Sequence, residues 1–173
     1  MNDIIETIEY KNYNIELCYD TSPDNPREFH ENFGFMACFH NRYKLGDEHT
    51  FKEPQELLDW IEANKNTLYY LPLYLYEHGN ITISATPFQC RFDSGQIGFI
   101  YITKERTEKE GLTDPYDVLK HEVSIYDAYI SGQTFGARIL DSEGEVIDSR
   151  FGYIGDTTDY VINEAKNMID TYN

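Results

Sequence analysis

The chain has 173 residues and carries 31 acidic against 14 basic side chains, which gives a formal net charge of -17. Its hydrophobic content of 40%, with 15 tyrosines and 10 phenylalanines, excludes a disordered chain and is sufficient for a buried core. The acidic residues are spread along the chain, so the folded surface must carry the negative charge, which repels nucleic acid and excludes direct binding to it.

The first half of the chain is predicted to contain two strands and one helix. Residues 9–20 alternate weakly and place Ile15 and Leu17 on one face of a strand. Turn residues follow at 21–32, because prolines disfavour helix in the residues before them. A second strand is expected at 33–40, a polar loop at 41–50 and a helix at 53–66, with Pro54 in its first turn.

The stretch from residue 68 to 104 has the densest apolar and aromatic content and is predicted to hold three strands. In the first strand, leucines and tyrosines alternate. His78-Gly79-Asn80 tolerates positive φ angles and predicts a hairpin to the second strand, which starts at Ile81. The third strand, residues 97–102, is apolar on both faces, which is typical of a central strand.

The remaining residues predict a helix, a hairpin and a last helix. Asp114 caps the first of these helices, Pro115 is its first residue and Gly132 ends it. The hairpin joins 134–140 to 146–154, and the last helix spans about 156–172. The prediction is therefore an α+β fold in a single domain, residues 1–173: an antiparallel or mixed sheet of about six to seven strands with about three helices packed on it.

Several features bear on where the protein acts. No apolar run reaches the roughly 20 residues that a membrane span needs, and MNDIIETIEY lacks the basic start of a signal peptide. The three cysteines, Cys18, Cys38 and Cys90, form no CxxC pair and no disulfide framework. We therefore expect a cytoplasmic protein without membrane contact.

Candidate metal ligands are few. They are His30 with Glu31, Cys38 with His40, and the run Asp47, Glu48, His49. Each group has a plain alternative as packed or solvated residues, and His121-Glu122 lacks the second histidine of the metalloprotease motif. No glycine-rich phosphate loop occurs either, so neither a metal nor a cofactor is predicted.

The loops at 40–49 and 87–96 offer a possible enzyme site. Cys90 or Ser94 could act as nucleophile, with His40 or His78 as base and Asp93 as orienting residue. The loop at 87–96 lacks the Gly-x-Ser-x-Gly elbow, and Asp-Ser-Gly is common turn chemistry. As a small hydrolase-like enzyme, the protein would form its pocket from His40, Arg42, Asp47, Asp93 and Ser94.

Several segments resemble one family. They are PREFHENFGFMACFHNRYKLGDEH (26–49), LPLYLYEHGNITISATPFQCRFDSGQIGFIYITKE (71–105), HEVSIYDAYISGQTFGARILD (121–141) and GEVIDSRFGYIG (144–155). Together they resemble a family of small acidic proteins from bacteriophages and mobile elements of Gram-positive bacteria. Members often have a Pro-Trp pair where this chain has Cys90-Arg91-Phe92. The resemblance implies an accessory gene and a place in the cytoplasm of a bacterial host, and it implies no mechanism.

In that context the charge favours a non-enzymatic inhibitor of a host defence protein, such as a restriction or CRISPR nuclease. Carboxylates about 5–6 Å apart on a helix can imitate the phosphates that such a protein binds. The candidate partner-binding residues are Asp141, Glu143, Glu145, Asp148, Asp156, Asp159 and Glu164.

Two other readings of the surface stay open. The charge can serve solubility alone, and an exposed stripe of Tyr70, Tyr74 and Tyr76 would instead indicate a protein-binding module that uses aromatic patches. Burial of these tyrosines under a helix is the simpler expectation. The oligomeric state is not predicted.

Overall fold

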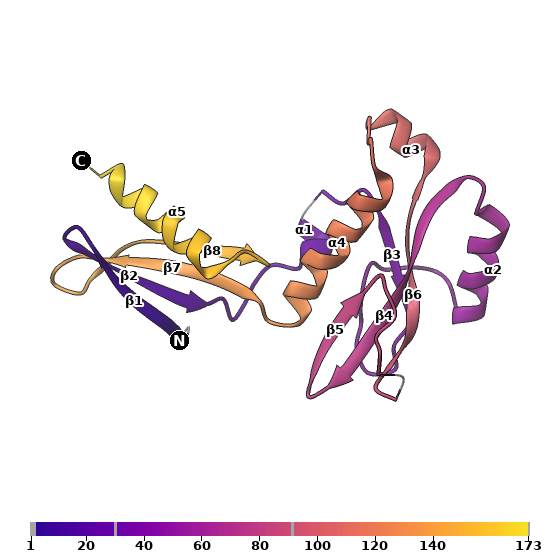
Figure 1. Ribbon diagram of the computed structural model, residues 1–173, viewed down its shortest axis with the longest axis horizontal. Coiled ribbons are helices and arrows are strands. Elements are labelled where there is room, and N and C mark those ends of the chain that lie inside the picture. The colour runs from indigo at the N-terminus through magenta and orange to yellow at the C-terminus, as the bar shows by residue number, and fades with distance from the viewer. Residues whose placement is uncertain (1–2, 30, 91, 173) are drawn as a thin grey trace. The chain divides into compact units, whose positions relative to one another are not determined.

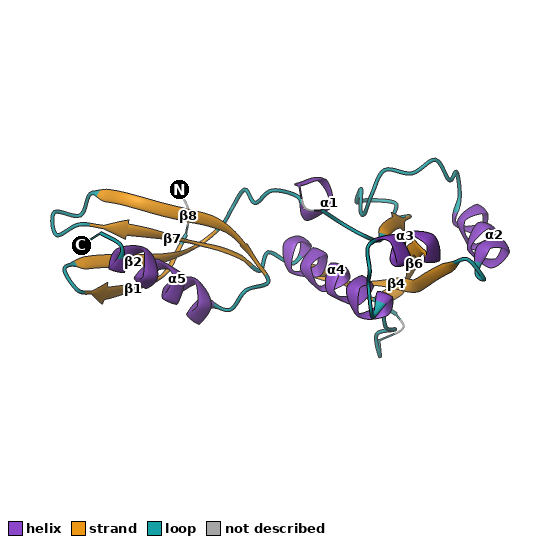
Figure 2. Ribbon diagram, turned by 90° about the horizontal axis from the view of Figure 1, so that it is seen from above, coloured by secondary structure: helices purple, strands orange, loops and turns teal. Residues whose placement is uncertain are grey.

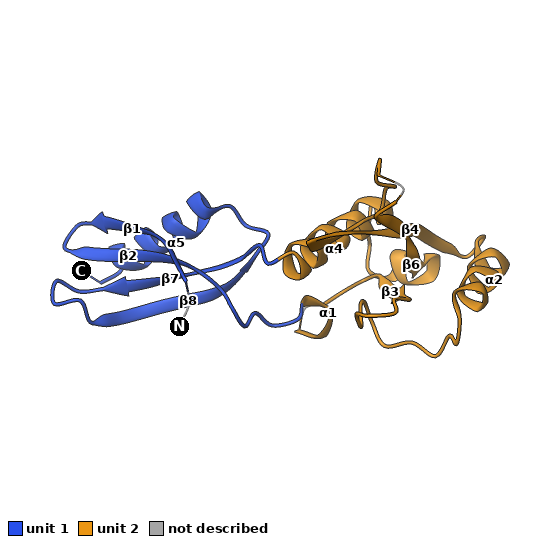
Figure 3. Cartoon of the chain, turned by 90° about the horizontal axis from the view of Figure 1, so that it is seen from below, with its two compact units in different colours: residues 1–25, 132–173 blue, residues 26–131 orange. Residues whose placement is uncertain are grey.

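The computed structural model describes residues 3–29, 31–90 and 92–172. The chain divides into two compact units, unit 1 with Met1–Asn25 and Gly132–Asn173, and unit 2 with Pro26–Ser131 (Figure 3). The α+β class is confirmed. The predicted counts were too low, because the described residues form eight strands in two antiparallel sheets, together with five helices. The two units are described separately below.

Unit 1 is a four-stranded antiparallel sheet with one helix on one face (Figure 1). Its elements are β1 (Ile4–Tyr10), β2 (Tyr13–Tyr19), β7 (Thr134–Leu140), β8 (Val146–Ile154) and α5 (Thr158–Asp170). The strand order is β1-β2-β7-β8. Ile15, Leu17 and Ile139 from the sheet and Val161 and Ile169 from α5 are almost fully buried and form its core.

Residues 9–20, predicted as one strand, contain the end of β1, a two-residue turn and the whole of β2. Lys11 adopts a φ of 56° in the two-residue turn between Tyr10 and Tyr13. Strand β1 is absent from the predicted elements because five of its seven residues are exposed and only Ile8 and Tyr10 pack against the core. The β7–β8 hairpin and α5 are where the sequence predicts them, and the Thr157 hydroxyl caps α5 by accepting from the Tyr160 N–H.

Unit 2 holds the other sheet between two helices. Its strands are β3 (Phe35–Cys38), β4 (Leu68–His78), β5 (Asn80–Ser84) and β6 (Ser94–Thr103), in the order β3-β6-β4-β5. Its helices are α1 (Pro26–Phe29), α2 (Pro54–Asn64), α3 (Lys104–Lys109) and α4 (Pro115–Ile130). Strand β6 lies inside the sheet, as its two apolar faces predict.

The two faces of this sheet have separate cores. Met36 belongs to the core under α4, whereas its neighbour Ala37 packs in the core under α2, as the two-residue period of a strand requires. The Asp114 carboxylate caps α4 as predicted, by accepting from the Asp117 N–H at 3.0 Å. No helix among the described residues is long and apolar enough to cross a membrane.

Candidate functional site

Unit 2 brings most of the predicted enzyme residues together. Four of the five, His40, Arg42, Asp93 and Ser94, line one open hollow of about 390 Å³. The hollow lies where the loop after β3 meets the start of β6, and Glu77 near the end of β4 completes it. The fifth residue, Asp47, lines a neighbouring hollow that also contains His40 and Arg42.

Glu77 is the residue of this hollow that the sequence analysis missed. Its carboxylate accepts from the Tyr43 hydroxyl at 3.0 Å and pairs with the Arg42 guanidinium. The His40 Nε2 lies 3.8 Å from the same carboxylate. Glu77 is one acid among 31 in the sequence, and only the sheet places it beside the loop at 40–43. Strand β6 pairs with β4 on one side, and on its other side the Ile97 carbonyl accepts from the Phe39 N–H at 2.7 Å.

The hydrogen bonds of His40 and Ser94 fix their roles. The His40 Nδ1 accepts from the backbone N–H groups of Arg42 and Tyr43, both at 3.2 Å, so the ring proton resides on Nε2. The Ser94 hydroxyl donates to the Cys90 carbonyl at 2.5 Å. A serine nucleophile needs a base that accepts its proton, and here the accepting atom is a carbonyl oxygen. The hollow therefore offers polar groups for a ligand, without an activated nucleophile.

Cys90 and His78 both contact Asp93. The Cys90 Sγ lies 3.5 Å and the His78 Nδ1 3.6 Å from the Asp93 Oδ2. The carboxylate thus contacts the thiol directly, whereas in a catalytic triad the histidine would stand between the two. Arg91, next in the chain to Cys90, lies outside the described residues.

Asp47 has a structural role in unit 2. Its Oδ1 accepts from the Arg27 Nε at 2.9 Å, and its Oδ2 accepts from an Arg27 Nη at 2.6 Å and from the Met36 N–H at 2.8 Å. The Arg27 side chain is only 2% exposed. Asp47 therefore fixes Arg27 and the edge of β3, and its oxygens already have partners.

Five of the candidate metal ligands line one hollow: Cys38, His40, Asp47, Glu48 and His49. The His49 Nε2 bonds the Cys38 carbonyl at 3.0 Å, and burial raises the pKa of the Cys38 thiol to about 12, so the thiol stays protonated. Among the described residues, no three His, Cys, Asp or Glu side chains come together as a metal-binding group. His30 lies outside the described residues.

Unit 1 carries the second candidate site, an acidic surface. Its sequence holds 14 acidic and 4 basic residues, a formal net of -10 in 67 residues. Three of the four bases face a carboxylate: Lys11 with Asp170, Arg138 with Glu16 and Arg150 with Glu164. The fourth, Lys166, lies 5.6 Å over the ring of Tyr10. The other 11 acids of unit 1 have no basic partner among its described residues.

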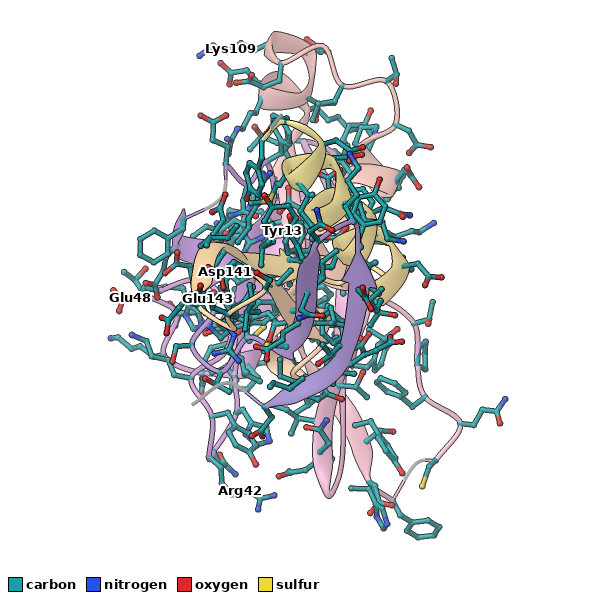
Figure 4. The ribbon with its side chains drawn as sticks, turned by 90° about the vertical axis from the view of Figure 1, so that its left-hand side faces the viewer. Tyr13, Arg42, Glu48, Lys109, Asp141 and Glu143 are labelled. Atoms are coloured by element: carbon teal, nitrogen blue, oxygen red, sulfur yellow. The ribbon has the colours of Figure 1, made fainter. Side chains whose placement is uncertain are left out.

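The seven predicted partner-binding acids all lie in unit 1, in three places. Asp141, Glu143 and Glu145 lie in the β7–β8 turn. Figure 4 looks onto this turn and labels Asp141 and Glu143. Asp156 and Asp159 stand at the start of α5, at the other end of the sheet (Figure 1). Asp148 and Glu164 lie between these two groups.

Three of the seven acids already have partners within unit 1. The Asp141 Oδ1 accepts from the N–H groups of Glu143 and Glu145 at 2.9 and 3.0 Å and so shapes the turn. Asp148 accepts from the Tyr172 hydroxyl at 2.8 Å. Glu164 faces Arg150. Glu143, Glu145, Asp156 and Asp159 are exposed and free for a partner.

The tyrosine stripe is neither fully buried nor fully exposed. Tyr70, Tyr74 and Tyr76 are half-buried. Tyr70 packs edge-on against Phe99 with 6.1 Å between ring centroids, and Tyr76 packs against Phe88 at 5.6 Å. Two of the three rings thus have aromatic partners within unit 2.

Comparison of the chain with protein-family models, with curated proteins and with solved structures finds no match.

Proposed function

We propose that the protein is a non-enzymatic inhibitor that binds a nucleic-acid-binding protein through the acidic surface of unit 1. The target is a protein of a host defence system, such as a restriction or CRISPR nuclease, in the phage or mobile-element context that the resemblance implies. One observation carries the proposal: the four basic side chains of unit 1 are all engaged within it, and 11 of its 14 carboxylates have no basic partner among its described residues, including the exposed Glu143, Glu145, Asp156 and Asp159.

The exposed acids at the β7–β8 turn and at the start of α5 support this function because each end of unit 1 presents a negative group. The two groups are separated by the length of β8, nine residues, or about 30 Å at about 3.3 Å per residue. That span is suited to a nucleic-acid-binding groove, whose Lys and Arg side chains follow phosphates over several base pairs. Such contacts speed association and weaken as salt screens the charges.

The test is a DNA mobility-shift competition with a panel of restriction and CRISPR nucleases, at about 50 mM and about 300 mM salt. We expect the protein to displace DNA from at least one nuclease at low salt and less well at high salt. The variant E143Q/E145Q/D156N/D159N should weaken this inhibition by on the order of tenfold or more, because each surface charge pair contributes about 0.2–1 kcal/mol.

The matched control is E105Q/E108Q/E110Q/D117N in unit 2, where all four residues are also exposed. It changes the net charge equally and, like the test variant, includes one acid in the first turn of a long helix. Inhibition should survive this change. Equal loss in both variants, or no displacement by the wild type from any nuclease at low salt, would refute the proposal.

A second candidate function is a small hydrolase-like enzyme in the hollow of unit 2, favoured by the convergence of His40, Arg42, Asp93 and Ser94 on one hollow. Nitrophenyl esters and phosphates are suitable probes. If this candidate holds, Ser94→Ala abolishes turnover, whereas Ser124→Ala on α4 leaves it unchanged. The bond from Ser94 to the Cys90 carbonyl makes the absence of turnover the expected result.

A further inference from the structure

The two sheets have four edge strands, and three of them are blocked in the same way. An open edge presents unpaired N–H and C=O groups that recruit another strand, so proteins usually cover it. In β3, β5 and β8 a carboxylate takes an edge N–H: Asp47 that of Met36 at 2.8 Å, Asp127 that of Ile83 at 2.8 Å, and Asp148 that of Ser149 at 2.7 Å.

Strand β1 is the exception. The two-residue turn after it makes Tyr10 and Tyr13 a hydrogen-bonded pair, and bonded and non-bonded pairs alternate along an antiparallel ladder. The backbone groups of Thr7 and Glu9 therefore point away from β2. Among the residues that the structure describes, none bonds the N–H of Thr7 or Glu9. Figure 2 shows β1 as an outer strand of its sheet, opposite β8.

We propose that β1 pairs with the β1 of a second copy of the chain, antiparallel and about a two-fold axis at Thr7. The pairing joins the two four-stranded sheets of the copies into one continuous sheet of eight strands. In this register all seven residues of β1 are paired, and Thr7 faces Thr7 of the second copy. A two-fold axis makes such an interface closed, so it yields a dimer and no fibre.

The side chains of β1 fit this register. Glu6 then faces Ile8 of the second copy, and Glu9 faces Ile5, so no two glutamates stand opposite one another. The neighbouring register with Ile5 opposite Thr7 would place Glu6 against Glu6, which is unfavourable. The register with Glu9 opposite Thr7 would pair only five residues.

Two further features of β1 agree with the pairing. Ile4 and Ile5 are 50% and 39% exposed, a large apolar area for a strand end. The strand pair β1–β2 is irregular between Ile4 and Glu6, which leaves the three central residues, Glu6 to Ile8, in regular register. The centre of the proposed interface is thus undistorted.

The charge of unit 1 gives this dimer a salt dependence of its own. Unit 1 of each copy carries a net charge of -10, so the two copies repel each other, and salt screens that repulsion. The dimer should therefore tighten as salt rises, whereas binding of a basic partner to the acidic surface should weaken. The two proposals fail independently.

The experiment compares the full-length wild type with Thr7→Pro and Thr7→Ala by sedimentation equilibrium over about 1–200 µM protein, at about 50 mM and about 500 mM salt. Proline removes an N–H that β2 does not use, a substitution that edge strands tolerate. Thr7→Pro should weaken the dimer on the order of tenfold or more, because both central hydrogen bonds are lost. Thr7→Ala keeps the N–H and should dimerise like the wild type.

Circular dichroism at low concentration checks that Thr7→Pro folds. Amide exchange gives a second readout, independent of any variant: the N–H groups of Thr7 and Glu9 should exchange more slowly at high than at low protein concentration, and that of Met36 should not change. A wild type that stays monomeric at high salt overturns the proposal. So does a dimer in which the exchange of Thr7 and Glu9 is independent of concentration.

Discussion

Arg27 joins several segments of unit 2 through its buried guanidinium. Its guanidinium makes at least five hydrogen bonds, to Asp47, Glu122, Asn32 and the Gly34 carbonyl. Burial alone lowers the pKa of Arg27, but the hydrogen bonds and charges of Asp47 and Glu122 outweigh it and raise the pKa above its ordinary value. A buried cation is stable only with such partners.

Arg27→Met tests this role. It leaves the two carboxylates of Asp47 and Glu122 without their shared cation, which should cost about 3–5 kcal/mol of unfolding free energy. Urea unfolding followed by the fluorescence of Trp60, the single tryptophan, measures the loss in unit 2. The control is Lys65→Met in the same unit, whose ammonium is 53% exposed and 3.1 Å from Glu62, and whose loss should leave the urea midpoint almost unchanged. Similar losses in both variants would contradict the role of Arg27.

The buried side chains of Tyr126 and Cys38 predict that unit 2 loses stability at alkaline pH. Burial raises the pKa of Tyr126 to about 12 and that of the Cys38 thiol to about 12. Both groups are neutral in the fold and ionise earlier in the unfolded chain, at pKa values near 10 and 8.5. Their stabilisation is therefore complete below the unfolded pKa and disappears as the pH rises towards 12.

We expect the urea concentration at the unfolding midpoint of unit 2 to decrease as the pH rises from about 8 to about 10.5. Tyr126→Phe removes one of the two groups and should reduce this fall, although it also removes the hydroxyl that accepts from the Gly46 N–H at 2.9 Å. Tyr116→Phe, at a residue that is 43% exposed, should leave the fall unchanged. A midpoint independent of pH would disprove the argument.

At the scale of elements, strand pairing in unit 2 requires a glycine at one position of β6. A Cβ atom on Gly98 would lie 1.9 Å from the Ala37 carbonyl oxygen of β3. A backbone atom cannot move aside as a flexible side chain does, so the two strands would have to separate.

Gly98→Ala should therefore destabilise unit 2 by about 1–3 kcal/mol or more. Gly95→Ala is the control within the same strand, because nothing lies within 4 Å of a Cβ atom built there. Gly95→Ala should change stability by about 0.5 kcal/mol at most. Urea unfolding of the two variants measures the difference, and Gly98→Ala should have the lower midpoint. Equal midpoints would contradict the close approach of β3 and β6.

Element prediction succeeded where local chemistry is decisive. Helices α2 and α4 were found from Pro54 and Asp114, and α5 from Asp156 or Thr157, of which Thr157 is the cap. The backbone or side chains of these residues suit a helix start whatever surrounds them. Helices α1 and α3 were missed because four and six residues are too short for a periodic pattern. Strand β1 was missed because only Ile8 and Tyr10 of this edge strand contact the core, too few residues for an alternating pattern.

At the scale of the whole molecule, unit 2 is inserted into unit 1. The chain leaves unit 1 after Asn25 and re-enters it at Gly132, so β2 pairs with β7 across more than 100 residues of sequence. Unit 2 is one continuous segment with its own two cores. The prediction of a single domain rested on the absence of a linker. Because an insertion between two strands needs no linker, the single domain stays a prediction.

Expression of residues 26–131 alone tests the independence of unit 2. Its cores contain no residue of unit 1, so we expect this fragment to unfold cooperatively, with the Trp60 emission of the full chain. Rings of Phe51 and Tyr101 surround Trp60 at 5.7 and 4.9 Å, which makes its emission a sensitive probe. A fragment without a cooperative transition would support one indivisible domain.

The candidate sites were predictable to different degrees. The hypothesis that the loops at 40–49 and 87–96 meet at one end of the sheet rested on each loop following a predicted strand, and it named four residues of the hollow. Glu77 and the hydrogen bonds of His40 were not predicted. The acids of unit 1 were named from charge alone. Which of them are exposed and which shape a turn, as Asp141 does, follows only from the fold.

The sequence by itself determined the α+β class, the starts of the long helices, the β4–β5 and β7–β8 hairpins and the excess of negative charge, because these depend on residues close together in the chain or on composition. Only the tertiary structure decided that there are two sheets, that Arg27 joins Asp47 and Glu122, and that β1 alone among the described edge strands lacks a carboxylate on its outer N–H groups. These features depend on residues far apart in the sequence, such as Arg27 and Glu122, which are 95 positions apart, or on which backbone groups remain unpaired, and a local pattern carries no information about either.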